Sequence, residues 1–199
     1  AMMCLKDLMN SIGCQNLDCR QDTASIGKIR ASYLFNSTIA GIDTTDAILI
    51  IGSNPRWEAP VLNARIRKRF LTGETSIAMI GPDLNLTYDY QHLGKEPNVI
   101  DDLINGSNNF WHTLDKAKHP MVILGSGALA REDGEVILFK VRELAEKYGF
   151  VEGNWNGFNV LQNAASRVGG LDLGFKPTDP LALDTLNILK AASSDLSLI

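Results

Sequence analysis

Three short stretches of this chain are apolar at nearly every position: residues 47–51, 76–80 and 121–124. An apolar stretch of this length is typical of a strand that is covered on both faces, as in a parallel sheet flanked by helices. A glycine follows each stretch directly, and glycine commonly ends a strand. We therefore expect three buried strands.

Between and after these strands, apolar residues recur at the spacing of a helix. Pro60 fits the first turn of a helix, because its missing N–H would have no intrahelical partner there. The apolar stripe after it comprises Val61, Leu62, Ile66 and Phe70. A second stripe comprises Val136, Ile137, Phe139, Val141, Leu144 and Ala145. Strand, glycine turn and helix make a Rossmann-like half-unit, so the predicted fold class is α/β, with Rossmann-like parallel sheets flanked by helices.

The remaining segments are predicted from weaker patterns. Further helices are expected at 3–12, 99–104 and 180–192, and from Phe110 onward. Residues 83–94 and 155–160 are expected to be loops, and the aromatic side chains of the first should pack back onto the sheet.

Two subdomains are predicted, with a boundary near residue 115. The first is a Rossmann-like subdomain with an N-terminal helix at 1–115, and the second is an α/β subdomain at 116–199. Residues 195–199 resemble the start of a strand that no turn follows. We therefore expect the second subdomain to be truncated at its C-terminal end, as in a piece of a longer chain.

Charge and hydropathy exclude several classes of partner. The 199 residues are 45% hydrophobic, with 19 Lys and Arg against 23 Asp and Glu, a net charge of −4. A folded protein of this charge has no general attraction to nucleic acid or to an anionic membrane. No apolar stretch is long enough to span a bilayer, so no direct membrane insertion is expected.

Metal and catalytic chemistry find little support in the residue spacing. The cysteines, at positions 4, 14 and 19, match neither a CxxC zinc site nor a ferredoxin cluster motif, and are expected to be ordinary thiols in a reducing compartment. His92, His112 and His119 lie in different segments without metal-ligand spacing, and no GxSxG is present. We therefore predict no catalytic and no metal-binding residue.

Two glycine turns are candidates for phosphate binding. Gly52, Ser53 and Asn54 follow one buried strand, and residues 125–127 follow another, where an α/β sheet usually receives a ligand. Glycine is also needed simply to let the chain reverse, and neither turn is a complete GxGxxG or GxxxxGK[ST]. On the residues alone, both interpretations stay open.

A basic cluster at Arg65, Arg67, Lys68 and Arg69 also allows two interpretations. Such a run is usually a solvated face of a helix. It would also suit docking onto an acidic partner.

Four segments, in this order along the chain, resemble a known family: 46–68, 86–94, 121–134 and 171–175. The chain resembles the large iron–sulfur subunits of NADH–quinone oxidoreductase, respiratory complex I, in their molybdopterin-oxidoreductase-like region. The resemblance implies a module that packs against other hydrophilic-arm subunits, on the cytoplasmic face of a bacterial inner membrane or on the matrix side in mitochondria. It also implies that the iron–sulfur clusters lie upstream in the parent subunit, with none in this fragment.

The chain departs from its cofactor-binding relatives at two places. Those molybdenum enzymes hold a pterin dinucleotide with their version of the Gly52–Pro55 turn, usually with His-Pro a few residues on, where this chain has Glu58-Ala59-Pro60. They also tend to have Asp-Pro-Arg where this chain has Gly81-Pro82-Asp83. A carboxylate at Glu58 would repel a phosphate. The resemblance therefore implies that Gly52, Ser53 and Asn54 are a vestigial cofactor site.

Three functions follow as hypotheses. The first is a cofactor-free structural and docking module that supports electron transfer from NADH to quinone in the assembled complex. The second is a nucleotide- or molybdopterin-dinucleotide-binding oxidoreductase domain. The third is a standalone nicotinamide enzyme, against which the lack of a GxGxxG motif counts.

Overall fold

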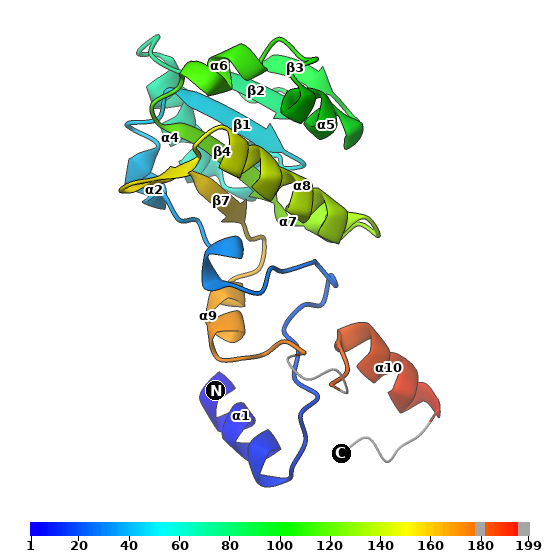
Figure 1. Cartoon of the computed structure of the whole chain (residues 1–199). Coiled ribbons are helices and arrows are strands. Elements are labelled where there is room, and N and C mark those ends of the chain that lie inside the picture. The colour runs from blue at the N-terminus through cyan, green and yellow to red at the C-terminus, as the bar shows by residue number, and fades with distance from the viewer. Residues whose placement is uncertain (178–181, 195–199) are drawn as a thin grey trace. The chain divides into compact units, whose positions relative to one another are not determined.

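Two compact units make up the chain. The computed structural model describes residues 1–177 and 182–194 (Figure 1). The central unit comprises Ser25–Asn163, and the terminal unit comprises Ala1–Ala24 together with Ala164–Ile199. The predicted subdomain boundary near residue 115 stays a prediction. Strands from both sides of that residue pair in one sheet of the central unit.

The central unit is built on a five-stranded parallel sheet with the strand order β3-β2-β1-β4-β7. The strands are β1 (Ala47–Ile51), β2 (Ser76–Ile80), β3 (Gln91–Gly94), β4 (Pro120–Gly125) and β7 (Phe158–Leu161). Ile51 pairs with Ile80 on one side and with Leu124 on the other, so the carboxyl ends of the three central strands are level. The predicted α/β fold with a parallel sheet is confirmed.

Two strands of the sheet lie in segments that were predicted to be loops. β3 is the edge strand beyond β2, and its polar residues Gln91 and His92 are exposed, so no apolar run marks it. β7 is buried at every position, but its four residues include Asn159, which interrupts the apolar pattern. The loop predictions for these two stretches were therefore wrong.

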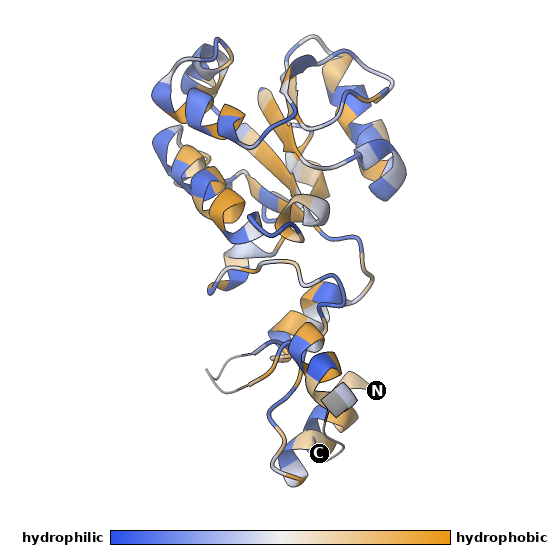
Figure 2. Cartoon of the chain, turned by 90° about the vertical axis from the view of Figure 1, so that its right-hand side faces the viewer, coloured by the Kyte–Doolittle hydropathy of each residue, from blue (hydrophilic) through white to orange (hydrophobic). Residues whose placement is uncertain are grey.

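Helices cover the sheet, and Figure 2 shows the apolar strands enclosed between them. The helices of the central unit are α2 (Thr38–Gly41), α3 (Pro55–Glu58), α4 (Pro60–Phe70), α5 (Asn98–Asn105), α6 (Trp111–Lys116), α7 (Ser126–Leu129) and α8 (Gly134–Lys147), with a 3-10 turn at Arg30–Ser32 and a small hairpin of β5 (Val151–Glu152) and β6 (Trp155–Asn156). From α4, Leu62 and Ile66 pack into a core cluster with Ile48 and Ile50 of β1.

Three residues of the predicted apolar stripes face solvent instead. Val61 on α4 is 79% exposed, and Val136 and Phe139 on α8 are exposed as well. Leu62 and Ile66 set the buried face of α4. At about 100° per residue, Val61 lies about 100° from Leu62 and about 140° from Ile66 around the helix axis. The predicted stripes are therefore wider than the buried faces of the two helices.

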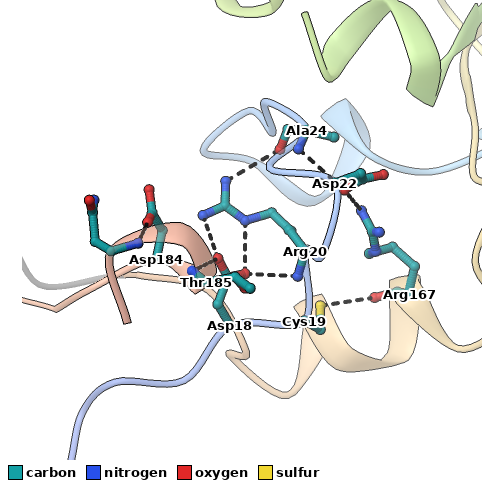
Figure 3. Close-up of polar contacts among 9 residues, drawn as sticks. Asp18, Cys19, Arg20, Asp22, Ala24, Arg167, Asp184 and Thr185 are labelled. Atoms are coloured by element: carbon teal, nitrogen blue, oxygen red, sulfur yellow. Dashed lines mark hydrogen bonds and ion pairs between the residues drawn. The ribbon is translucent and has the colours of Figure 1, made fainter. Parts of the chain in front are cut away.

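The terminal unit joins the two ends of the chain through polar contacts (Figure 3). Its helices are α1 (Met2–Ser11), α9 (Arg167–Asp172) and α10 (Thr185–Ser194). The carboxylate of Asp18 accepts hydrogen bonds from Arg20 Nε at 2.9 Å, from Arg20 Nη2 at 3.0 Å and from the Thr185 N–H at 3.1 Å. The helix predicted at 180–192 is confirmed from Thr185 onward, and it was wrong for residues 182–184, which are not helical. Residues 180–181 and the predicted strand at 195–199 lie outside the described residues.

Acid is expected to loosen the terminal unit through Asp22, whose carboxylate lies 3.0 Å from Nη1 of the buried Arg167. Burial alone would raise the pKa of Asp22, but the Arg167 side chain and the Ala24 N–H hold it below its usual value. A depressed folded-state pKa stabilises the fold above the unfolded pKa of about 3.9, and this contribution is lost as pH falls through the folded pKa. Hydrogen exchange of the α9 amides, followed from pH 6 to pH 3, measures this effect.

Two variants check the assignment. Asp22→Asn should exchange faster than the wild type at pH 6 and should show a smaller acid dependence. Asp7→Asn, which changes an exposed carboxylate on α1, should behave as the wild type does. An unchanged acid dependence in Asp22→Asn would contradict the role given to this residue.

Candidate functional site

The two candidate glycine turns lie against one another at the carboxyl edge of the sheet. Gly52 follows β1 with φ +57°, a conformation that favours glycine, and its N–H donates to the Ile80 carbonyl of β2 at 2.9 Å. At Gly125, which ends β4, an added Cβ would come within 2.3 Å of the Gly52 carbonyl oxygen. Both glycines are therefore required by the close approach of the two turns, whether or not a ligand binds there.

A pocket of about 470 Å³ opens beside these turns. Its lining includes all three residues of the first candidate turn, Gly52, Ser53 and Asn54, and Gly127 of the second. The other lining residues are Ile51, Glu58, Ile80, Gly81, Pro82, Leu84, Lys95, Pro97, Ile100, Ala128, Arg131 and Ile137. The pocket thus stands where parallel α/β sheets generally bind ligands, beyond the carboxyl ends of the strands.

The carboxylate of Glu58 is bound to the first turn. Its Oε1 accepts the backbone N–H of Asn54 at 2.8 Å, and its Oε2 accepts the hydroxyl of Ser53 at 2.8 Å. Ser53 is buried, and hydrogen bonds to an ionised acceptor are stronger than those between neutral groups. Glu58 therefore occupies the donors that a phosphate oxygen would need.

The turn as arranged does not fit the diphosphate of a pterin dinucleotide. The carboxylate of Glu58 would lie next to the phosphate and repel it. The side-chain oxygen of Asn54 is buried without a hydrogen-bond partner among the described residues, and it also can only accept. The Glu58 carboxylate and the side-chain oxygen of Asn54 would both have to turn away before an anion could bind at Ser53 and Asn54.

Two cationic side chains line the same pocket, and sequence patterns did not point to either. Lys95 follows β3, and Arg131 lies in the loop before α8. Arg131 is paired with Asp133, with Nε 2.7 Å from Oδ1, and this hydrogen bond holds the pKa of the Asp133 carboxyl below its usual range. Both cations belong to connections distant in sequence from Gly52, so no local motif could have linked them to it.

The histidines make separate contacts with the backbone or with neighbouring rings. His92 Nε2 lies 2.7 Å from the Gly81 carbonyl oxygen, His119 Nδ1 lies 3.2 Å from that of Thr44, and His112 stacks on Trp111. Among residues 1–177 and 182–194, no group of three or more His, Cys, Asp and Glu side chains is placed to hold a metal ion. Over the same residues, no helix has the length and apolar character that crossing a membrane requires.

All three cysteines carry free thiols. Burial raises the pKa of Cys19, and the nearby Arg167 opposes this only in part. A thiol with a raised pKa is a poor nucleophile near neutral pH. Burial therefore outweighs the positive charge of Arg167 and Arg20 at Cys19, and this thiol is not an activated nucleophile.

The family model described as molybdopterin oxidoreductase matches residues 1–193. This chain belongs to the molybdopterin oxidoreductase family. The match extends over the central unit and into both segments of the terminal unit, and the parallel α/β sheet is consistent with this family.

Within the molybdopterin oxidoreductase family, the chain is similar to subunits of NADH-quinone and NADH-ubiquinone oxidoreductases. It is 42% identical over 176 residues to an NADH-quinone oxidoreductase subunit of Rickettsia bellii, covering 88% of the chain and 26% of the relative. The identity to the subunit of the same name from Rickettsia conorii is 40% over 196 residues, 98% of the chain and 29% of the relative. The mitochondrial NADH-ubiquinone oxidoreductase 78 kDa subunit of Candida albicans is 44% identical over 179 residues, 88% of the chain and 25% of the relative. The predicted resemblance is confirmed, and the chain spans about a quarter of the length of these relatives.

Proposed function

We propose that this chain is a cofactor-free structural and docking module of the large subunit of an NADH–quinone oxidoreductase. It carries no catalytic residue of its own, and Gly52, Ser53 and Asn54 are a vestigial cofactor site. It supports electron transfer from NADH to quinone in the assembled complex, while the iron–sulfur clusters are held by the upstream part of the parent subunit. Its place is peripheral, among hydrophilic-arm subunits, on the cytoplasmic face of a bacterial membrane or on the matrix side in mitochondria.

The contact of Glu58 with its own turn is the observation that carries this proposal. One carboxylate satisfies both the Asn54 N–H and the Ser53 hydroxyl, as a phosphate oxygen would. An internal anion of this kind costs no binding entropy, because the chain itself holds it in place. It therefore stabilises the turn without a ligand and competes with any phosphate that approaches.

The relatives support the assignment to a respiratory complex. Each relative compared above bears the name of an NADH-quinone or NADH-ubiquinone oxidoreductase subunit. A fold that descends from cofactor-binding enzymes can persist as a scaffold after its chemistry is lost. The electron-transfer activity in those names belongs to the relatives, and we extend it to this chain only as part of the assembled complex.

Removal of the internal anion tests the proposal. The wild-type chain should show no binding of inorganic pyrophosphate or of guanosine diphosphate in calorimetric titration, and its melting temperature should not change with either ligand. Glu58→Ala should bind pyrophosphate with a Kd of about 1 mM or below, because the turn regains two free donors and loses one negative charge. Glu96→Ala removes an exposed carboxylate from the neighbourhood of Arg131 and is the matched control, expected to behave as the wild type.

Each outcome discriminates between the hypotheses. Binding of guanosine diphosphate by the wild type would favour the alternative, a nucleotide- or molybdopterin-dinucleotide-binding oxidoreductase domain. Binding of NADH by the wild type would favour the standalone nicotinamide enzyme. Failure of Glu58→Ala to bind pyrophosphate would contradict the description of Gly52, Ser53 and Asn54 as a former anion site.

A further inference from the structure

Helix α4 and the short helix α3 before it carry large apolar side chains that no described residue covers. Trp57 is 81% exposed and Val61 is 79% exposed, the two highest values among the large hydrophobic residues that the structure describes. Leu71, the C-cap residue of α4, is 64% exposed. Single exposed apolar residues are ordinary, but here two of them stand at the two ends of α4 and the third stands in α3 just before it.

Helical spacing puts the exposed residues of α4 on one face. Val61, Ala64, Lys68 and Leu71 are separated by three, four and three residues, and all four are exposed; we call them the α4 face. The opposite side of the helix is buried through Leu62 and Ile66, so α4 cannot turn to bury this face as well. None of the described residues covers this face.

All charged residues of α4 itself are positive. No acidic residue stands between Glu58 and Glu74 in the sequence. Asp43 is paired with Arg65 at 2.7 Å, Glu74 is paired with Arg69, and Glu58 is bound to its own turn. These contacts neutralise two arginines, and the Glu74 side chain stays 66% exposed.

Three cations remain without an ion-pair partner among the described residues. Arg56 Nη1 and Arg67 Nε donate to the neutral carbonyls of Asn85 and Thr87, at 3.0 and 3.2 Å. Lys68, on the α4 face itself, makes no hydrogen bond or close ion pair in the same part of the chain, although its charge acts on the Asp43 carboxylate from a distance. An exposed apolar stripe bordered by uncompensated positive charge is complementary to an apolar stripe bordered by negative charge.

We propose that the α4 face, with Trp57, docks an amphipathic helix of another protein whose apolar ridge is flanked by aspartate or glutamate. The apolar ridge packs against Trp57, Val61 and Leu71, and the flanking carboxylates meet Arg56, Arg67 and Lys68. The proposal names the chemistry of one partner for the docking role proposed above, and it rests on that role. A second copy of this chain is the competing occupant, because α8 exposes Val136 and Phe139 beside Glu132, Glu135 and Glu143.

A defined probe tests the charge and the face together. The probe is a synthetic helical peptide with leucine along one face and glutamate on both flanks, compared with the same peptide carrying lysine in place of glutamate. Fluorescence anisotropy should give a Kd for the glutamate peptide about tenfold lower than that for the lysine peptide, and added salt should narrow this difference. Val61→Asp and Lys68→Glu should each weaken binding of the glutamate peptide about tenfold. Val136→Asp, the same change at an exposed valine of α8, should leave binding unchanged.

Four outcomes of these measurements would contradict the docking proposal. Equal binding of the two peptides, no binding of either, or wild-type binding by Val61→Asp would overturn the proposal. Sedimentation that shows an oligomer of the wild type, lost in Val61→Asp, would assign the face to a second copy of this chain and would also overturn it. None of these outcomes bears on the pyrophosphate titration, which reports on the Gly52 turn, so the two proposals fail independently.

Discussion

A Gly125→Ala variant is expected to lose about 3 kcal/mol of its free energy of unfolding, because the new methyl group has no space. The added Cβ would lie 2.3 Å from the Gly52 carbonyl oxygen, 2.8 Å from the Gly52 carbonyl carbon and 2.8 Å from the Ser53 Cβ. Two of these atoms are backbone in the turn after β1, which β1 and β4 hold in register. Relief of the clash requires the carboxyl ends of the two strands to separate. Equilibrium denaturation in urea measures the loss.

Gly127→Ala is the matched control, two residues away in the same turn. Its added Cβ would meet only the Gly52 carbonyl oxygen, at 3.7 Å, which is ordinary van der Waals contact. Gly127 lies in α7, where alanine is favoured over glycine by up to about 1 kcal/mol, so the control should be as stable as the wild type or more so. Equal losses in the two variants would mean that turn flexibility, and not the close approach of Gly52 to Gly125, makes glycine necessary here.

The central strands of the sheet were predictable from the sequence because all of their residues are buried. β1 and β4 are buried at every position, so both faces of each strand demand apolar side chains. The pattern then appears in the sequence as an uninterrupted apolar run. A glycine after each run locates the turns, and the relative position of the turns follows from the parallel sheet.

The periphery was not predictable in the same way. The edge strand β3 has polar, exposed residues, since one of its sides faces solvent, and the sequence pattern is that of a loop. At Val61 the pattern indicated an apolar stripe, but the buried face of α4 is narrower than the run of apolar residues. From a run of apolar residues alone, a helix with a wide buried face cannot be distinguished from a helix with a narrow buried face and exposed apolar residues beside it.

The candidate site was predictable only in its backbone. Charge repulsion at Glu58 followed from its position near the turn, but the two hydrogen bonds to Ser53 and Asn54 depend on how the short α3 folds back. Lys95 and Arg131 come to the pocket from connections that hold no motif. Their position depends on loop geometry, which a single sequence does not encode in a readable pattern.

An Asn63→Ala variant is expected to lose about 3 kcal/mol of its free energy of unfolding, because it leaves two buried polar groups without partners. Asn63 on α4 is buried; its Nδ2 donates to the Leu86 carbonyl at 3.1 Å, and its Oδ1 accepts the hydroxyl of the buried Tyr88 at 2.9 Å. These bonds hold the segment between β2 and β3 on α4, and they explain why its aromatic residues pack inward, as the sequence predicted. Burial also raises the pKa of the Tyr88 hydroxyl, which therefore stays a donor over the whole physiological range.

A double-mutant cycle with Tyr88→Phe separates the hydrogen bond from the packing. The losses of unfolding free energy in Asn63→Ala and in Tyr88→Phe should add up to about 1 kcal/mol more than the loss in the double variant. The reason is that Tyr88→Phe removes the hydroxyl that Asn63→Ala leaves without a partner. Asn85→Ala, an exposed asparagine of the same segment, is the control and should cost less than about 1 kcal/mol. Losses that simply add would mean that Asn63 and Tyr88 stabilise the fold separately. In that case the segment would be held by the burial of Leu86 and Tyr88 alone, and the hydrogen bonds would follow from that packing.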